Sequence, residues 1–384
     1  MSIYLDYNAS APIDPNVLQY MIDIYQNHIG NADSRTHDHG EDARSLVEVA
    51  RGHVASLFGV KKDETFFTSG ATESNNIAVL GLKDYGLKSG RRHMVTTAIE
   101  HKAVLGAMKH LEAEGFELDM VNPNSDGYIS AADILSKVRS DTLVVSVMHV
   151  NNETGMIQPV DQIGAALSGT ETLFHIDATQ SAGKLVPEIQ NLQYDLMSFS
   201  GHKIHAPQGI GGLILKRKHY RLPPVSPIMF GGAQEHGIRP GTLPTALIAG
   251  LGKACEIAEQ NYDSNQRYNT NIKSRLLELL AASGVMYEFN GSLEHCVPTT
   301  LNVSFLGISS EALMLAVRQY CSIANGSACT SANYQHSHVL SAMGLSGERI
   351  ESAVRISWDA DICEDMLFLE FSNMLNIVRG FASV

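Results

Sequence analysis

The sequence has few of the features that mark secreted, membrane-spanning or metal-ribbon proteins. Its five cysteines are an odd number and form no CxxC pair, which argues against a disulfide framework or a zinc ribbon. No apolar run approaches the length of a membrane span. The amino-terminal MSIYLDYNASAP meets a charge and a proline too early for a signal peptide. We therefore expect a cytoplasmic protein with reduced thiols, no membrane association and no metal site.

Basic residues are also scarce. Twenty-eight Lys and Arg stand against 41 Asp and Glu, a formal net charge of −13. Such a chain has no broad electrostatic footprint for nucleic acid, so we expect no direct nucleic-acid binding. Its 384 residues, 44% apolar and 18% charged, are an ordinary globular composition and are long enough for two domains.

The chain does contain a regular alternation of short apolar strands with helical segments. Strands alternating with helices predict an α/β fold with a mostly parallel, seven-stranded sheet covered on both faces. Asp14-Pro15 is a typical helix start, and Gly59 ends a second helical pattern. The strand candidates are residues 64–69, 93–98, 116–121, 142–150, 172–177, 195–200 and 211–216.

The pattern of strand and helix candidates changes after about residue 246. Residues 246–283 contain no proline and predict one long helix between two domains. Two further strands, 300–305 and 353–358, alternate with amphipathic helices as in a smaller α+β unit. We expect a large α/β domain over 15–262 and a small α+β domain formed by 1–14 and 263–384.

Unusual polar groups stand where the predicted strands end, the edge of an α/β sheet at which ligands collect. Ser69-Gly70-Ala71-Thr72 opens a helix, which either binds an anion such as phosphate or simply caps that helix. Asp177 is either a partly desolvated carboxylate that needs a cationic or hydrogen-bond-donating partner, or the cap of a helix. His101 is either a functional group or a satisfied core histidine.

Lys203 is unusual within SFSGHKIHAPQGIGG, because it is a charged residue with no acidic residue within seven positions of it in the sequence. A desolvated lysine becomes nucleophilic. A nucleophilic lysine, an aspartate, a histidine and a phosphate cradle of Thr72, Ser200 and His202 are together the groups that pyridoxal phosphate (PLP) requires.

The chain resembles the class V, fold-type-I PLP-dependent transferases, and within them the cysteine desulfurases of the NifS/IscS kind. The resemblance extends over nearly the whole length and is carried by YLDYNASAP, GNADSRTH, TSGATESNN, IEHKAV, HVNNETG, HIDATQS, SFSGHKI, RPGTLP, NGSACTSA and VRISW. It implies a PLP-binding large domain and a homodimer that converts L-cysteine to L-alanine.

The resemblance also implies a role for individual positions. Lys203 would form the Schiff base, Asp177 would pair with the pyridine nitrogen, and Gln180 would bond the ring hydroxyl. His101 would stack on the ring and assist proton transfer. The phosphate would be bound by Ala71, Thr72, Ser200 and His202, with Thr242 contributed to the neighbouring subunit's cofactor. The substrate carboxylate would be bound by Asn31, Asn152 and Arg355, of which Asn152 also contacts the cofactor.

Cys329 decides which PLP reaction is expected. It lies in SIANGSACTSAN, a run of small residues typical of an exposed loop, whereas the other cysteines stand in apolar or helical contexts. By resemblance, Cys329 takes the sulfur of L-cysteine as a persulfide and passes it to a protein acceptor. Segments 142–160 and 227–244 look most like the desulfurase of bacterial DNA phosphorothioation.

Several alternatives stay open. The sulfur serves iron–sulfur clusters or tRNA thiolation in the housekeeping members, but they carry a longer carboxyl-terminal tail for their scaffold protein. A selenocysteine lyase would share the fold. A metal site at His37 and His39, or at His336 and His338, lacks companion ligands at metal spacing. A non-catalytic scaffold would not need Lys203.

Overall fold

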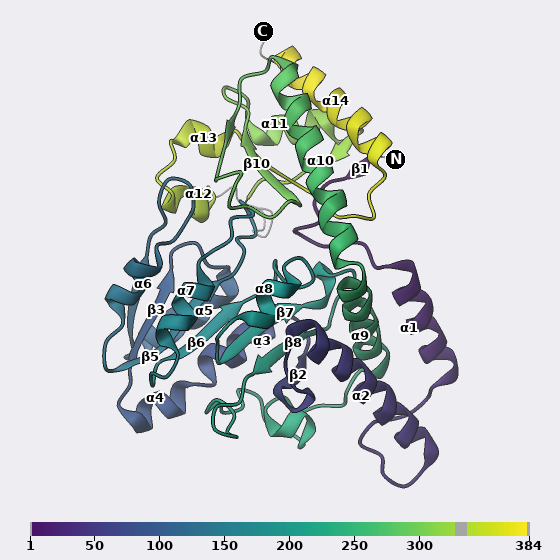
Figure 1. Ribbon diagram of the computed structural model, residues 1–384, viewed down its shortest axis with the longest axis vertical. Helices are drawn as coiled ribbons and strands as arrows, with labels where there is room; N and C mark the ends of the chain where they lie inside the picture. Colours follow the sequence, from purple (N-terminus) through teal and green to yellow (C-terminus); the bar gives the residue numbers. More distant parts are fainter. Residues whose placement is uncertain (1, 327–335, 382–384) are drawn as a thin grey trace.

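The computed structural model describes residues 2–326 and 336–381, and a seven-stranded sheet dominates its lower part (Figure 1). β8 runs antiparallel to its neighbours β2 and β7, and the other neighbouring pairs are parallel. The predicted, mostly parallel sheet is therefore confirmed. Its strands, in spatial order, are β2 (Thr65–Thr68), β8 (Gly211–Leu215), β7 (Leu196–Ser200), β6 (Leu173–Asp177), β5 (Thr142–Met148), β3 (His93–Thr97) and β4 (Glu117–Val121).

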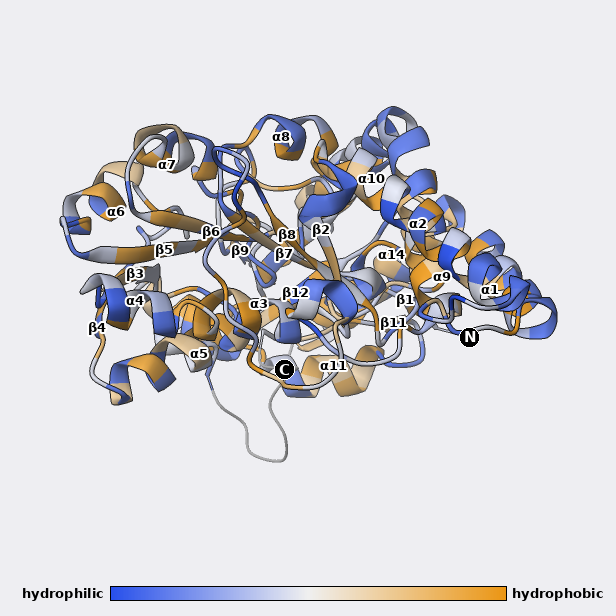
Figure 2. Cartoon of the chain, turned by 90° about the horizontal axis from the view of Figure 1, so that it is seen from below, coloured by the Kyte–Doolittle hydropathy of each residue, from blue (hydrophilic) through white to orange (hydrophobic). Residues whose placement is uncertain are grey.

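Helices cover both faces of this sheet, which is why every strand except the edge strand β4 is buried or nearly so along its length. Figure 2 shows α6 (Ala131–Lys137), α7 (Val160–Leu167) and α8 (Val186–Asn191) on one side. The other side carries α3 (Ala71–Leu80), α4 (Lys83–Ser89) and α5 (Lys102–Ala113).

The predicted helix ends are confirmed in α1 (Pro15–Asn27) and α2 (Asp38–Phe58). The carboxylate of Asp14 accepts hydrogen bonds from the first-turn N–H groups of α1, as a cap should. Gly59 ends α2 in the left-handed conformation, with φ of 63°.

The expectation of one continuous helix over 246–283 is wrong. The segment forms α9 (Thr245–Gln260) and α10 (Tyr262–Ser283), which meet at Asn261 with φ of −97° and ψ of 4°. Asparagine favours such breaks because its short polar side chain competes for backbone hydrogen bonds. α10 still leads from the large sheet to the upper part of the molecule (Figure 1).

The upper part has a separate hydrophobic core, built from the amino-terminal Leu5 and Tyr7 together with apolar side chains of α10, β10, α11, β12 and α14. An antiparallel sheet runs through it in the order β12-β10-β9, and β1 pairs with β11 beside it. Because this core is distinct, we propose domain boundaries at 14/15 and 262/263. The elements are β1 (Ile3–Tyr4), β9 (Glu288–Phe289), β10 (Thr300–Ser304), α11 (Ser310–Val317), β11 (Cys321–Ser322), α12 (His338–Ala342), α13 (Gly347–Glu351), β12 (Ala353–Ser357) and α14 (Glu364–Phe381).

Among the helices of residues 2–326 and 336–381, none combines the length and the apolar composition needed to cross a bilayer. In the same residues, no cluster of three His, Cys, Asp or Glu side chains is arranged to hold a metal ion.

Candidate active site

A cavity of about 410 Å³ lies at the carboxyl ends of the parallel strands, where the amino-terminal segment and β12 close over the large sheet. This volume is in the range of small-molecule sites. The cavity brings together most of the residues predicted from the sequence: Ala71, Thr72, His101, Asn152, Asp177, Gln180, Ser200, His202, Lys203 and Arg355.

One wall is the turn between β2 and α3, which is suited to an anion. Gly70 has φ of 152°, a conformation that side chains rarely adopt, and precedes the first turn of α3. The first N–H groups of a helix have no intrahelical partner, so they are available to a phosphate. Ser200 lies beside Gly70, its Oγ 3.5 Å from the position a Cβ would take. Burial and the nearby Lys203 charge lower the pKa of His202 to about 4, so His202 is neutral at pH 7.

Asp177 ends β6 and is only 3% exposed. Its Oδ2 accepts from Asn75 Nδ2 at 2.8 Å, and its Oδ1 accepts from the backbone N–H of Thr179 at 3.0 Å. These neutral donors orient the carboxylate without neutralising its charge. The negative charge is therefore available to a protonated ring nitrogen. Asn75 belongs to the motif TSGATESNN, but the sequence alone does not indicate its contact with Asp177.

Lys203 follows β7 in the short 3₁₀ turn η2 (Gly201–Lys203). Its Nζ donates to the backbone carbonyls of Asn8 at 2.7 Å and Ala9 at 2.5 Å. Gln180 Nε2 donates to the same Asn8 carbonyl at 2.9 Å, while Gln180 Oε1 is buried and has no hydrogen-bond partner within residues 2–326 and 336–381. Sequence reasoning missed Asn8 and Ala9, because nothing in the sequence shows that residues 195 positions apart meet.

His101 is the N-cap residue of α5. Its Nδ1 accepts from the backbone N–H of Ala103 at 3.2 Å, so a neutral His101 ring carries its proton on Nε2. This hydrogen bond holds the imidazole ring at the amino-terminal end of α5, where His101 lines the cavity. The side chain therefore caps a helix and lines the cavity, and because His101 is only half-buried it is not a core histidine.

Arg355 projects from β12 and is 4% exposed. Its Nη2 pairs with Asp6 Oδ1 at 2.5 Å, its Nη1 donates to the Asn152 carbonyl at 3.0 Å, and its Nε is buried without a hydrogen-bond partner among the described residues. The guanidinium is thus held rigidly, and its remaining N–H donors, that of Nε among them, can serve a carboxylate. Asp6, like Asn8 and Ala9, was not predicted from the sequence.

Two predicted residues lie outside this cavity in the single chain. Asn31 is exposed in a turn, and Thr242 is exposed in the loop before α9. Gln234 connects the two segments, because it donates to Asp33 at 2.6 Å and accepts from the Gly241 N–H at 2.9 Å. Asn31 and Thr242 therefore belong to one surface region.

Cys329 lies outside the described residues. Of the remaining cysteines, Cys255 and Cys321 are buried, and burial raises the pKa of the Cys321 thiol to about 12. Burial also raises the pKa of Cys296. These thiols are poor nucleophiles at neutral pH. Cys363 is exposed and is not among the described residues that line the cavity.

The cavity fits PLP on its own chemistry. The α3 turn offers N–H groups for a phosphate, Asp177 offers a negative charge for a ring nitrogen, and Lys203 offers a primary amine. The orphan acceptor Gln180 Oε1 suits a ring hydroxyl, since a buried acceptor without a donor is costly.

Comparison with known proteins agrees with this geometry. The class-V aminotransferase family model matches residues 3–364. The cysteine desulfurase IscS of Serratia proteamaculans is 42% identical over 93% of this chain and 88% of its own. A NifS-like protein superposes with a TM-score of 0.90, 34% identity and coverage of 99% and 100% of the two chains. DndA from Streptomyces lividans superposes with a TM-score of 0.81, 43% identity and coverage of 91% and 98%.

The members of this family depend on PLP, and the relatives that match nearly the whole length are cysteine desulfurases. The chain therefore belongs to the class-V aminotransferase family and, within it, to the cysteine desulfurases.

Proposed function

We propose that the cavity residues act on L-cysteine in the roles expected from the sequence, with Cys329 as the sulfur carrier. When bound, PLP supplies an electron sink for the substrate carbon. Arg355 binds the substrate carboxylate through Nε, and Lys203 and His101 hold and move protons beside the ring. Asp177 stabilises the protonated ring nitrogen.

The sulfur transfer needs no outside oxidant. The Cys329 thiolate attacks the substrate sulfur, so that an S–S bond forms and the substrate Cβ–S bond breaks. The electron pair stays with the carbon skeleton, which takes up protons and leaves as L-alanine. The enzyme is left with a persulfide, and the numbers of atoms and electrons balance.

One observation carries this assignment of Cys329. Gly326 and Ser337, described residues on the two sides of segment 327–335, both lie beside the buried carboxylate of Glu153, next to the predicted substrate residue Asn152. Ser337 Oγ donates to Glu153 Oε2 at 2.5 Å, and a Cβ on Gly326 would lie 2.0 Å from the same oxygen. The position of these two residues next to Asn152 supports Cys329, which lies between them in the sequence, as the sulfur carrier.

We also propose a homodimer, because the region of Asn31 and Thr242 is exposed on the single chain. Exposed side chains such as these can bind substrate or cofactor only if a second subunit brings its cavity to them. Phe230, 89% exposed, and Ile29, 77% exposed, lie in the same two segments, as expected of surface that a partner covers.

For the physiological role we propose delivery of sulfur, through a protein acceptor, to DNA phosphorothioate modification. The support is the resemblance of segments 142–160 and 227–244, together with 43% identity to DndA. The similar identity to IscS proteins supports the second candidate, a donor for iron–sulfur clusters or tRNA thiolation.

The decisive experiment measures sulfide and alanine released from L-cysteine and a thiol reductant. Cys329→Ser should abolish both products while the cofactor absorbance stays. Cys363→Ser, the matched control at an exposed thiol, should retain parental rates. Loss of activity in the Cys363 variant alone would refute the assignment. Deleting the gene and analysing hydrolysed DNA by mass spectrometry separates the pathways, since only the phosphorothioation role predicts loss of DNA sulfur.

A further inference from the structure

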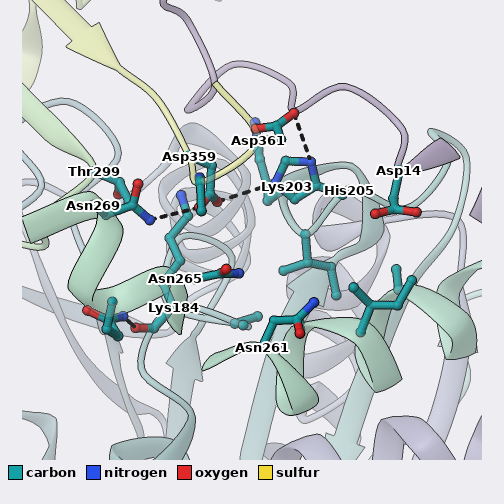
Figure 3. A pocket seen from close by; sticks show the side chains of 18 of the residues that line it. Asp14, Lys184, Lys203, His205, Asn261, Asn265, Asn269, Thr299, Asp359 and Asp361 are labelled. Carbon is teal, nitrogen blue, oxygen red and sulfur yellow. Dashed lines mark hydrogen bonds and ion pairs between the residues drawn. The ribbon is translucent and has the colours of Figure 1, made fainter. Parts of the chain in front are cut away.

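A second cavity, of about 230 Å³, lies where the large sheet, the junction of α9 and α10, and the loop after β12 come together (Figure 3). Lys203 is the residue that this cavity shares with the active site. A single water needs only about 10–15 Å³ of such space, so the cavity can admit a small organic molecule.

Two polar atoms of this cavity, Asn269 Oδ1 and Thr299 Oγ1, are buried without a hydrogen-bond partner among the described residues. Lys184, which is 6% exposed, lines the same cavity, and its Nζ makes no hydrogen bond or ion pair with the described part of the chain. Native interiors satisfy the great majority of buried polar atoms, so two orphan atoms beside a lysine in one cavity indicate a ligand.

The charge of Asp359 acts on Lys184, but the two make no direct hydrogen bond in the described part of the chain, because the Asp359 oxygens have other partners. Asp359 Oδ1 accepts from Asn269 Nδ2 at 3.0 Å, and Asp359 Oδ2 pairs with His205 Nε2 at 3.3 Å, as the dashed lines of Figure 3 show. Asp14 caps α1. The carboxylate of Asp361 lies 4.0 Å from His205 Nδ1.

The chemistry of the unsatisfied groups defines the ligand. Lys184 Nζ requires an oxyanion, whereas Asn269 Oδ1 requires a donor and Thr299 Oγ1 accepts or donates. Asp359 and Asp361 make the surroundings of those acceptors favourable for a positive charge. A zwitterionic α-amino acid meets both requirements, since it has a carboxylate for Lys184 and an ammonium for Asn269.

We propose that this cavity is a second amino-acid site, distinct from the active site, which binds the carboxylate at Lys184 and the ammonium at Asn269. The proposal rests on the desulfurase function only for the ligand's identity, since the enzyme consumes one small amino acid and releases another. A ligand here bridges the large-domain Lys184 and the small-domain Thr299 and touches Lys203. Occupancy is therefore coupled to the position of the active-site lysine.

The test is equilibrium dialysis of radiolabelled L-alanine against the holoenzyme after borohydride treatment. Reduction ties Lys203 to the cofactor, so that no amino acid can react in the active site. We expect one saturable site per chain. Lys184→Met should weaken binding at least tenfold, and Thr299→Val, which removes only the hydroxyl, should weaken it severalfold. Acetate should compete for the site.

Two control variants assign the binding to this cavity. Lys216→Met removes another desolvated lysine, at the far edge of the sheet, and should leave the affinity unchanged. Arg355→Lys alters the active site and should also leave it unchanged. The proposal is overturned if no saturable binding occurs, or if Arg355→Lys abolishes binding while Lys184→Met and Thr299→Val retain it. The dialysis experiment does not depend on sulfur transfer. Its result can therefore be interpreted even if Cys329 is not the sulfur carrier.

Discussion

Gly211 provides a sharp test of the phosphate cradle, because three backbones meet at this residue. It lies in β8, opposite Ser200 of β7 and Thr68 of β2. A Cβ at Gly211 would lie 2.6 Å from the Phe199 carbonyl oxygen and 2.7 Å from Gly70 Cα. Both neighbours are backbone atoms, so no side-chain rotation can relieve the contact.

We expect Gly211→Ala to displace the turn that contains Gly70. Overpacking of this kind costs about 1–3 kcal/mol, and each 1.4 kcal/mol is a factor of ten in affinity. If this cost is paid by displacing the phosphate-binding turn at Gly70, the affinity for PLP falls by roughly 5- to 150-fold. Titration of the apoenzyme with PLP, followed by absorbance, measures the effect.

Gly106→Ala is the matched control. Gly106 is exposed within α5, and a Cβ there would meet nothing within 4 Å. Replacing an exposed helical glycine by alanine stabilises by about 1 kcal/mol, so this variant should bind PLP normally and melt slightly higher. Parental PLP affinity and melting temperature in Gly211→Ala would refute the geometry of the cradle.

Three further predictions concern charge. Arg355→Lys loses the charge-assisted contact of Nε, worth about 1.5–3 kcal/mol, and should lower kcat/KM for L-cysteine roughly 10- to 150-fold in steady-state assays. Burial raises the pKa of Glu100 to about 8, so the folded state keeps a proton that the unfolded state loses above its ordinary pKa. Stability should fall from about pH 4.5 to 8, and Glu100→Gln should flatten the melting temperature over that range. Burial raises the pKa of Asp359, but the hydrogen bond from His205 and the charge of Lys184 outweigh it and hold the pKa at about 2. The resulting stability is present above about pH 4 and is lost as the pH falls to 2, and His205→Ala should reduce that acid sensitivity in melting experiments.

The local signals in the sequence determined the large sheet and most of the candidate site. Its strands are short apolar runs, and all of them except the edge strand β4 are buried or nearly so because helices cover both faces. In parallel strands the carboxyl ends meet at one edge, so Asp177, Lys203 and the α3 turn had to converge there. The break at Asn261 escaped prediction because a single residue's backbone conformation leaves no mark on hydrophobic periodicity.

Only the tertiary structure decided what surrounds these groups. Asn8 and Ala9 supply carbonyls to Lys203, and Asp6 pairs with Arg355, through contacts between distant parts of the chain. The cavity at Lys184 likewise joins groups from separate elements, and each of them looks ordinary in the sequence. A sequence pattern reports which face of an element is buried, whereas the partner of a buried polar group depends on how the elements pack.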